Sequence, residues 1–146
     1  MKKIFIYYSH SGNGEVVADY LKEQGFDIRR VVPKKPLPKN KFLGILVGGF
    51  KAGISLHDKL VDFDSNISDY EEIYIGSPIW NARLSSPINT VLDEIDLKKK
   101  QVTFVFYSGS GTSPKATEKV TGLFPEAKII DLKEPKSNKK ELDKLK

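Results

Sequence analysis

The sequence predicts an α/β fold in which a mostly parallel sheet of five strands is covered by helices on both faces. Two observations predict this fold. Short runs of β-branched and aromatic residues alternate with segments whose apolar residues recur at helical spacing. Small polar residues directly follow three of the strand segments, and a parallel sheet brings such loops to one edge. Both patterns extend over the chain of 146 residues, so we expect one domain, residues 1–146.

The composition is that of a globular protein and excludes several kinds of site. Hydrophobic residues make up 39% of the chain and charged residues 29%, which are usual values for a soluble domain. The chain has no cysteine, which excludes disulfides, thiolate metal sites and cysteine nucleophiles. Its two histidines are too few for a histidine-based zinc site without help from carboxylates. No apolar run is long enough for a membrane span or a signal-peptide core, so we expect a cytoplasmic protein.

The net charge of +5 is concentrated in two segments. Four lysines lie between residues 34 and 41, and six lie between residues 133 and 146 beside three acidic residues. Lysine runs of this kind are typical of solvated surface. They lack the interleaved aromatic residues of a nucleic-acid interface. We therefore expect neither nucleic acid nor a membrane as a partner.

The first strand and helix enclose the most informative stretch of the chain. Residues 4–8 are β-branched or aromatic, as a buried strand requires, and an apolar stripe follows at helical spacing over residues 16–21. A strand that turns through hydroxyls and glycines into a helix can hold a phosphate on unpaired backbone N–H groups. The alternative is an ordinary turn in which Ser11 or Asn13 caps the helix. Six small or polar residues form this turn: Ser9, His10, Ser11, Gly12, Asn13 and Gly14.

The next predicted element is a strand near the sheet edge. Gly25 stands where glycine commonly ends a helix. Residues 26–32 then have the pattern of a strand, and Arg29 and Arg30 indicate partial exposure. Prolines interrupt regular structure over residues 33–40, which predicts an extended linker.

A glycine-rich helix is predicted after this linker. Phe42, Ile45, Leu46, Gly49 and Phe50 recur at helical spacing. The three glycines at positions 44, 48 and 49 each weaken such a helix by about 1 kcal/mol relative to alanine. We interpret the segment as a short or irregular crossover helix that packs closely and covers the sheet, with a dimer or ligand surface as the alternative. The His57–Asp58 pair beyond it is expected at the surface.

The rest of the chain repeats the alternation of strands and helices. Strands are predicted over residues 70–76, 101–107 and 127–132. Helices are predicted over residues 87–95, where Pro87 suits the first turn, and over residues 115–123. For the lysine-rich tail, both a last helix and a frayed end agree with the sequence.

Loops that follow Tyr8, Gly76 and Tyr107 are expected to form one site, because the carboxyl ends of parallel strands meet at one edge. The second loop presents Trp80, which can stack on a flat ligand or pack partly buried. The third loop, residues 108–113, either offers backbone groups to the edge of a heterocycle or is a flexible connection. A phosphate, a planar ring and a polar ring edge together describe a mononucleotide, and FMN best of all.

At these loops the sequence resembles the flavodoxin-like family, and the resemblance covers the whole chain. Residues 8–15 are similar to the family's phosphate loop, residues 76–80 to the loop that places an aromatic on the flavin, and residues 107–111 to the third flavin-contacting loop. The resemblance implies a three-layer fold with strand order 2-1-3-4-5 and FMN where the order reverses. It implies no catalytic residue and no metal. By position, the implied FMN contacts are Ser9, His10, Ser11, Gly12, Asn13 and Gly14 at the phosphate, Pro78, Ile79, Trp80 and Asn81 beside the isoalloxazine, and Ser108, Gly109 and Gly111 on its other side.

The sequence departs from the family pattern in ways that affect the cofactor. Gly14 stands where the family usually has threonine, and His10 replaces a small hydroxylated residue. These departures imply weaker phosphate binding, unless His10 supplies a donor. Typical flavodoxins are acidic, whereas this chain is basic, so fewer nearby acids should raise the reduction potential of the flavin. Arg83 either adds to that effect, contacts a nicotinamide nucleotide or is a surface arginine.

Two functions are compatible with this reading of the sequence. The first is an FMN-binding electron carrier, in which the protein binds the cofactor and tunes its electronics. The alternative is an NAD(P)H-dependent FMN oxidoreductase of the quinone or flavin reductase type. The partner would be a redox protein or a small electron acceptor, and the chain a monomer or homodimer. A receiver-like signalling domain is disfavoured, because its acidic cluster and its aspartate after the third strand are missing.

Overall fold

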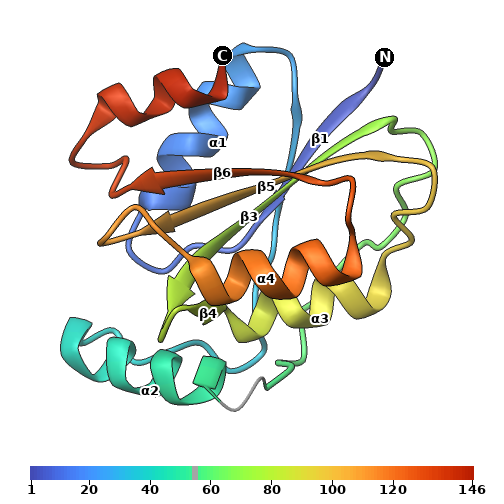
Figure 1. The fold of residues 1–146 in the computed structure, drawn as a ribbon. Helices are drawn as coiled ribbons and strands as arrows, with labels where there is room; N and C mark the ends of the chain where they lie inside the picture. The colour runs from blue at the N-terminus through green and yellow to red at the C-terminus, as the bar shows by residue number, and fades with distance from the viewer. Residues whose placement is uncertain (54–55) are drawn as a thin grey trace.

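A parallel sheet forms the centre of the protein in the computed structural model, which describes residues 1–53 and 56–146, without the side chains of residues 41, 42, 45, 52 and 53 (Figure 1). The strands follow the order β2-β1-β3-β5-β6, and each neighbouring pair is parallel. Counted along the chain, this is the predicted order 2-1-3-4-5, so the fold class is confirmed. The five strands are β1 (Lys3–Tyr7), β2 (Asp27–Arg30), β3 (Glu72–Trp80), β5 (Gln101–Ser108) and β6 (Lys128–Lys133).

Helices cover both faces of this sheet, as predicted. One core cluster packs α1 and the 3-10 helix η1 against the sheet, and the other packs α3 and α4 against its opposite face. Both faces of the central strands are therefore apolar, as a covered parallel sheet requires. The tail ends in ordered helical structure and not in a frayed end. The helices that cover the two faces are α1 (Asn13–Glu23), α3 (Ser86–Glu94), α4 (Pro114–Leu123) and η1 (Lys139–Leu145). In the described part of the chain, no helix is both long and apolar enough to cross a membrane.

Strand β1 shows how successive side chains divide between the two cores. Ile4 and Ile6 belong to the cluster on the α3 and α4 side, whereas Phe5 and Tyr7 belong to the α1 side. The rings of Phe5 and Tyr7 stack with centroids 5.0 Å apart. They lie over Gly76 of β3, where a Cβ atom would come within 2.5 Å of the Phe5 ring. This close contact requires glycine where the ends of β1 and β3 lie side by side, directly before the first two loops.

The prediction that Trp80 lies on a loop after Gly76 is wrong, because β3 continues to Trp80 and the chain turns back as a β-hairpin. The short strand β4 (Arg83–Leu84) pairs antiparallel with the end of β3. Asn81 and Ala82 both have positive φ, at 50° and 63°, as the tight two-residue turn of a hairpin requires. The usual sequence signal for such a turn is Asn-Gly, and its absence hid the hairpin. Trp80 consequently stands at the end of a strand and not on an open loop.

Helix α2 (Lys41–Gly53) lies at the carboxyl ends of the strands and not over a face of the sheet (Figure 1). It contacts β3, β4 and α3, so the prediction of a sheet-covering crossover helix is wrong. Leu46 and Phe50 on its outer side are 53% and 67% exposed. The side chains of Phe42 and Ile45, part of the predicted apolar stripe, lie outside the described residues.

Asp58 fastens the far end of α2 to the body of the protein. Its carboxylate pairs with Lys51 of α2 at 3.1 Å and accepts a hydrogen bond of 2.7 Å from Ser86 at the start of α3. The expectation of a surface position is therefore confirmed for His57, which is exposed and bonded to Asp93, but not for the half-buried Asp58.

Candidate functional site

The first loop leaves several backbone donors at the start of α1 without partners. Ser9 is buried, and its hydroxyl oxygen accepts a 3.0 Å hydrogen bond from the backbone N–H of Gly14. Gly12 is the N-cap residue, with φ of 96°, and no side chain caps the helix there. Neither Ser11 nor Asn13 takes the capping role offered by the alternative interpretation. Within the described chain, the backbone N–H groups of residues 10–13 have no hydrogen-bond partner. Unpaired amides at the positive end of a helix dipole suit a phosphate.

Gly14 is enclosed by three side chains. A Cβ atom at this position would lie 2.6 Å from the Ser9 Cβ, 2.8 Å from the Tyr107 hydroxyl oxygen and 2.8 Å from the Tyr7 ring. The Tyr107 hydroxyl donates a hydrogen bond to the backbone carbonyl of Tyr8, just before the loop. Gly14 is therefore not simply a position that lacks a threonine hydroxyl. Its missing side chain makes room for Tyr107, which joins the first loop to β5.

The tyrosines below the loop remain protonated donors at neutral pH. Burial raises the pKa of Tyr107 well above its usual value, with the Glu15 carboxylate adding a smaller effect in the same direction. Burial, followed by the negative charge of Asp58, raises the pKa of Tyr8 from 10.0 to about 12. Both hydroxyls therefore carry their protons over the range in which the protein would work.

These raised pKa values predict a loss of stability at alkaline pH. The folded protein holds the Tyr8 proton up to about pH 12, whereas the unfolded chain releases it near pH 10. The stabilising contribution is complete below pH 10 and is lost as the pH rises through the folded pKa, at about 1.4 kcal/mol per pH unit for one tyrosine. Urea unfolding of the wild type and of Tyr8→Phe, followed between these two pH values, measures the effect. The variant should lose stability less steeply, and identical slopes would contradict the assignment to Tyr8.

The second predicted segment brings Trp80 against the first loop. Its ring lies edge-on to Tyr8 with centroids 5.7 Å apart, and edge-on to His10 at 6.3 Å. The indole is half-buried, and its other neighbour is Gly48 of α2, where a Cβ atom would lie 2.7 Å from the ring. A Cβ atom at Gly44 would lie equally close to the His10 Nε2 atom. The two glycines thus let α2 approach both aromatic rings.

The other predicted residues of this segment differ in how far they can reach a ligand. Pro78 is buried inside the sheet, where it pairs with Tyr107. Ile79 is half-buried and packs against the core on the α3 and α4 side. Asn81 is exposed at the hairpin turn. Of the four, Trp80 and Asn81 are therefore the ones placed at the mouth of the site.

The third loop is a tight turn closed by its own hydrogen bonds. The Ser108 hydroxyl oxygen accepts a 3.0 Å hydrogen bond from the backbone N–H of Gly111, whose φ is 75°. Ser110 and Thr112 bond to each other across the turn. This geometry disfavours the interpretation of residues 108–113 as a flexible connection. Gly109 is exposed at the tip, so a ligand can reach its backbone.

The structure brings the three segments to one edge, as predicted, but it connects them unequally. The first loop touches the second through Trp80 and is joined to β5, directly before the third loop, by Tyr107. Between the third loop and Trp80 no direct hydrogen bond or ring contact is found among the described residues. A ligand lying between Trp80 and the third loop would complete the arrangement. Among all the residues that the structure describes, no group of three acidic or histidine side chains could hold a metal ion.

One residue beside the first loop was missed by the sequence analysis. Lys136, from the tail that was predicted to be solvated surface, donates its backbone N–H to the Asn13 side-chain oxygen at 3.0 Å. Its Nζ atom lies 3.4 Å from the Ser11 carbonyl oxygen. The two partners are 123 residues apart in the chain, and no local pattern signals such a contact.

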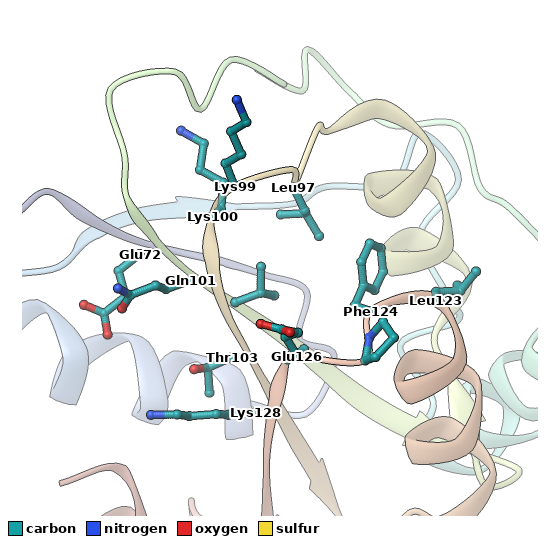
Figure 2. Close-up of a pocket in the computed structure, with 13 residues that line it drawn as sticks. Glu72, Leu97, Lys99, Lys100, Gln101, Thr103, Leu123, Phe124, Glu126 and Lys128 are labelled. Carbon is teal, nitrogen blue, oxygen red and sulfur yellow. The ribbon is translucent and has the colours of Figure 1, made fainter.

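A cavity of about 520 Å³ lies at the opposite end of the strands, where the strands begin (Figure 2). Its walls come from the first residues of β3, β5 and β6 and from the end of α4, so it is distant from the three loops. Figure 2 shows Lys99 and Lys100 extending away from Phe124 and not toward a common point. Lys100 already donates to the backbone carbonyls of Ile67 and Tyr70. The two lysines therefore do not converge on one point of the cavity, as the polar groups of a ligand site would.

Comparisons with known proteins agree with the fold and give the family. A profile of the flavodoxin family matches residues 2–144. A sequence comparison with curated proteins gives no match. A solved structure from Bacteroides eggerthii DSM 20697 superposes with a TM-score of 0.72 at 22% identity, covering 97% of this chain and 96% of the other.

Two further structures share the fold. A flavoprotein from Lactobacillus acidophilus NCFM, solved in complex with FMN, has a TM-score of 0.68 at 22% identity and covers 95% of this chain and 97% of the other. Oxidised flavodoxin 1 from Bacillus cereus has a TM-score of 0.52 at 16% identity and covers 98% and 93%. The profile spans nearly the whole chain, and the strand order agrees with it. The protein therefore belongs to the flavodoxin family.

Proposed function

We propose that this protein binds FMN at the carboxyl edge of its sheet and carries electrons between redox partners. The observation that carries the proposal is the row of unpaired backbone N–H groups at residues 10–13, directly beside the half-buried indole of Trp80. Such a row suits a phosphate, and the indole suits a flat ring. The FMN complex of the similar Lactobacillus acidophilus flavoprotein supports the choice of ligand.

The residues present fit this cofactor. Residues 10–13 would hold the phosphate through backbone donors, and Ser9 would keep the loop closed through its bond from Gly14. Trp80 and Asn81 would lie beside the isoalloxazine ring, with Gly109 at the other side. Bound FMN supplies the one- and two-electron redox chemistry. No side chain of this chain needs to donate or accept a proton as a catalytic acid or base for electron transfer.

A second candidate function is an NAD(P)H-dependent FMN oxidoreductase. Arg83 favours it, because this residue is the direct cross-strand partner of Trp80 in the hairpin and is only half-buried. Its guanidinium donates to the Asn81 carbonyl oxygen at 3.1 Å, which keeps the positive charge near the indole. A cation there suits a phosphate of a nicotinamide nucleotide.

Two measurements test the proposal and separate the candidates. Calorimetric titration of the purified apoprotein with FMN should show one binding site, and the loaded protein should have the two-band visible absorbance of a flavin. Absence of both would contradict FMN binding. Steady-state NADPH oxidation with menadione as acceptor then distinguishes the functions. A carrier alone should turn over negligibly, whereas sustained turnover would favour the oxidoreductase.

A further inference from the structure

The segment after β6 is a hydrogen-bonded turn that places Lys136 at the first loop. Glu134 has a positive φ of 43°, and the backbone N–H groups of Ser137 and Asn138 both donate to its carbonyl oxygen, at 2.9 and 3.0 Å. The Asn138 side chain also donates to the Lys133 carbonyl oxygen. Together with the hydrogen bond from the Lys136 backbone N–H to Asn13, these contacts hold Lys136 in a defined position.

The Lys136 side chain lies across the loop backbone at Gly12. A Cβ atom at Gly12 would come 3.1 Å from both the Cδ and the Nζ atoms of Lys136. The ammonium group lies 3.4 Å from the Ser11 carbonyl oxygen. An ammonium group has three N–H donors, and this single long contact leaves at least two of them available. The ammonium group thus lies at Ser11 and Gly12, two of the residues whose backbone N–H groups are unpaired.

The charge of Lys136 is not balanced by a neighbouring acid. None of the ion pairs found in the described part of the chain includes it. The one acidic residue in the first turn of α1 is Glu15, and its carboxylate pairs with Arg30 at 3.1 Å. The loop therefore combines neutral donors with one uncompensated positive charge. An anion with several acceptor oxygens satisfies both.

We propose that Lys136 binds the phosphate of the flavin nucleotide and thereby makes the site select FMN over riboflavin. This inference rests on the proposed function. Riboflavin has the same ring system but no phosphate, so it cannot use the ammonium group. A charge-assisted contact of this kind corresponds to a loss of about tenfold or more in affinity when the charge is removed.

The test compares two flavins on three variants. Lys136→Met keeps most of the side-chain length and removes the charge, and Lys136→Gln keeps a hydrogen-bond donor without the charge. Lys139→Met is the matched control, because this exposed lysine lies in the same tail and has no contact with the loop in the described structure. Each apoprotein is titrated with FMN and with riboflavin, at low salt and at about 0.3 M salt, where charge interactions are largely screened.

The proposal expects Lys136→Met and Lys136→Gln each to weaken FMN binding by about tenfold or more at low salt, with riboflavin binding unchanged. FMN binding to both variants should also depend less on salt than that of the wild type, and Lys139→Met should behave as the wild type. Equal losses for FMN and riboflavin would overturn the proposal, because they would show a distorted loop. Wild-type FMN affinity in Lys136→Gln would also overturn it, because a hydrogen bond without charge would then suffice.

A flavin-independent measurement separates this proposal from the proposed function. Titration with inorganic phosphate, followed by the NMR shifts of the Gly12 and Asn13 amides, should show saturable binding in the wild type and weaker binding in Lys136→Met. If phosphate binds in this way but neither flavin does, FMN binding fails and phosphate recognition by Lys136 stands. If FMN binds but Lys136→Met leaves both FMN and phosphate binding unchanged, the inference on Lys136 fails alone.

Discussion

Replacing Gly14 with threonine is expected to lower the free energy of unfolding by about 3 kcal/mol, the upper end of the usual cost of overpacking a core. The new Cβ atom would lie within 3.0 Å of Ser9, Tyr107 and Tyr7. All three neighbours are buried, and Tyr107 is also held by its bond to the Tyr8 carbonyl. None of them can move without disturbing the first loop. We therefore expect FMN affinity to fall as well, although the family pattern that the sequence resembles has threonine here. Urea unfolding and FMN titration measure the two effects.

Gly122→Ala is the matched control for this substitution. Gly122 also lies in a helix, but a Cβ atom there would meet nothing within 4 Å. Alanine should therefore stabilise the protein by about 0.5–1 kcal/mol through its helix propensity. Gly14→Thr with unchanged stability and tighter FMN binding would contradict the packing argument. That result would mean that Gly14 only lacks a phosphate-binding hydroxyl.

Trp80→Ala is expected to weaken FMN binding by about 10- to 100-fold, because stacking of a flat heterocycle on an aromatic side chain contributes about 1–3 kcal/mol. The same loss is expected for riboflavin, since the indole would contact the ring and not the phosphate. This equal loss distinguishes Trp80 from Lys136. Calorimetric titration of both flavins into the variant and the wild type measures it.

Two controls guard the interpretation of Trp80→Ala. Trp80→Phe keeps an aromatic ring against Gly48 and should retain part of the affinity. Leu123→Ala removes an exposed apolar side chain at the far edge of the sheet and should change neither flavin affinity. Wild-type FMN affinity in Trp80→Ala would contradict the stacking role and leave the indole as a packing residue between Tyr8 and α2.

The core strands could be predicted from the sequence because burial on both faces produces continuous apolar runs. Residues 4–8 and 101–107 were placed within one residue of β1 and β5. The gathering of the three loops at the carboxyl ends of the strands could be predicted from the parallel strand direction alone. The end of β3 could not be predicted in the same way. Pro78 has no N–H to donate to a neighbouring strand, so its presence argues against a strand at this position. In the structure it nevertheless pairs with Tyr107 of β5.

The features that shape the candidate site come from contacts between distant parts of the chain. The glycines of α2 look like weak helix formers in sequence, yet Gly44 and Gly48 admit the rings of His10 and Trp80. Gly14 looks like a lost hydroxyl until Tyr107 is seen beside it. Lys136 belongs to a charge run that is typical of solvated surface, and only the folded turn after β6 brings it to the first loop. None of these contacts has a local sequence signal.

The most direct test of the account uses the fluorescence of Trp80, which is the only tryptophan in the chain. Apoprotein is titrated with FMN while tryptophan emission and flavin emission are both recorded. If the phosphate binds at residues 10–13 and the ring lies against the indole, both emissions should be quenched together and saturate at one FMN per chain. Binding of FMN that leaves the tryptophan emission unchanged would contradict the account, as would the absence of any binding.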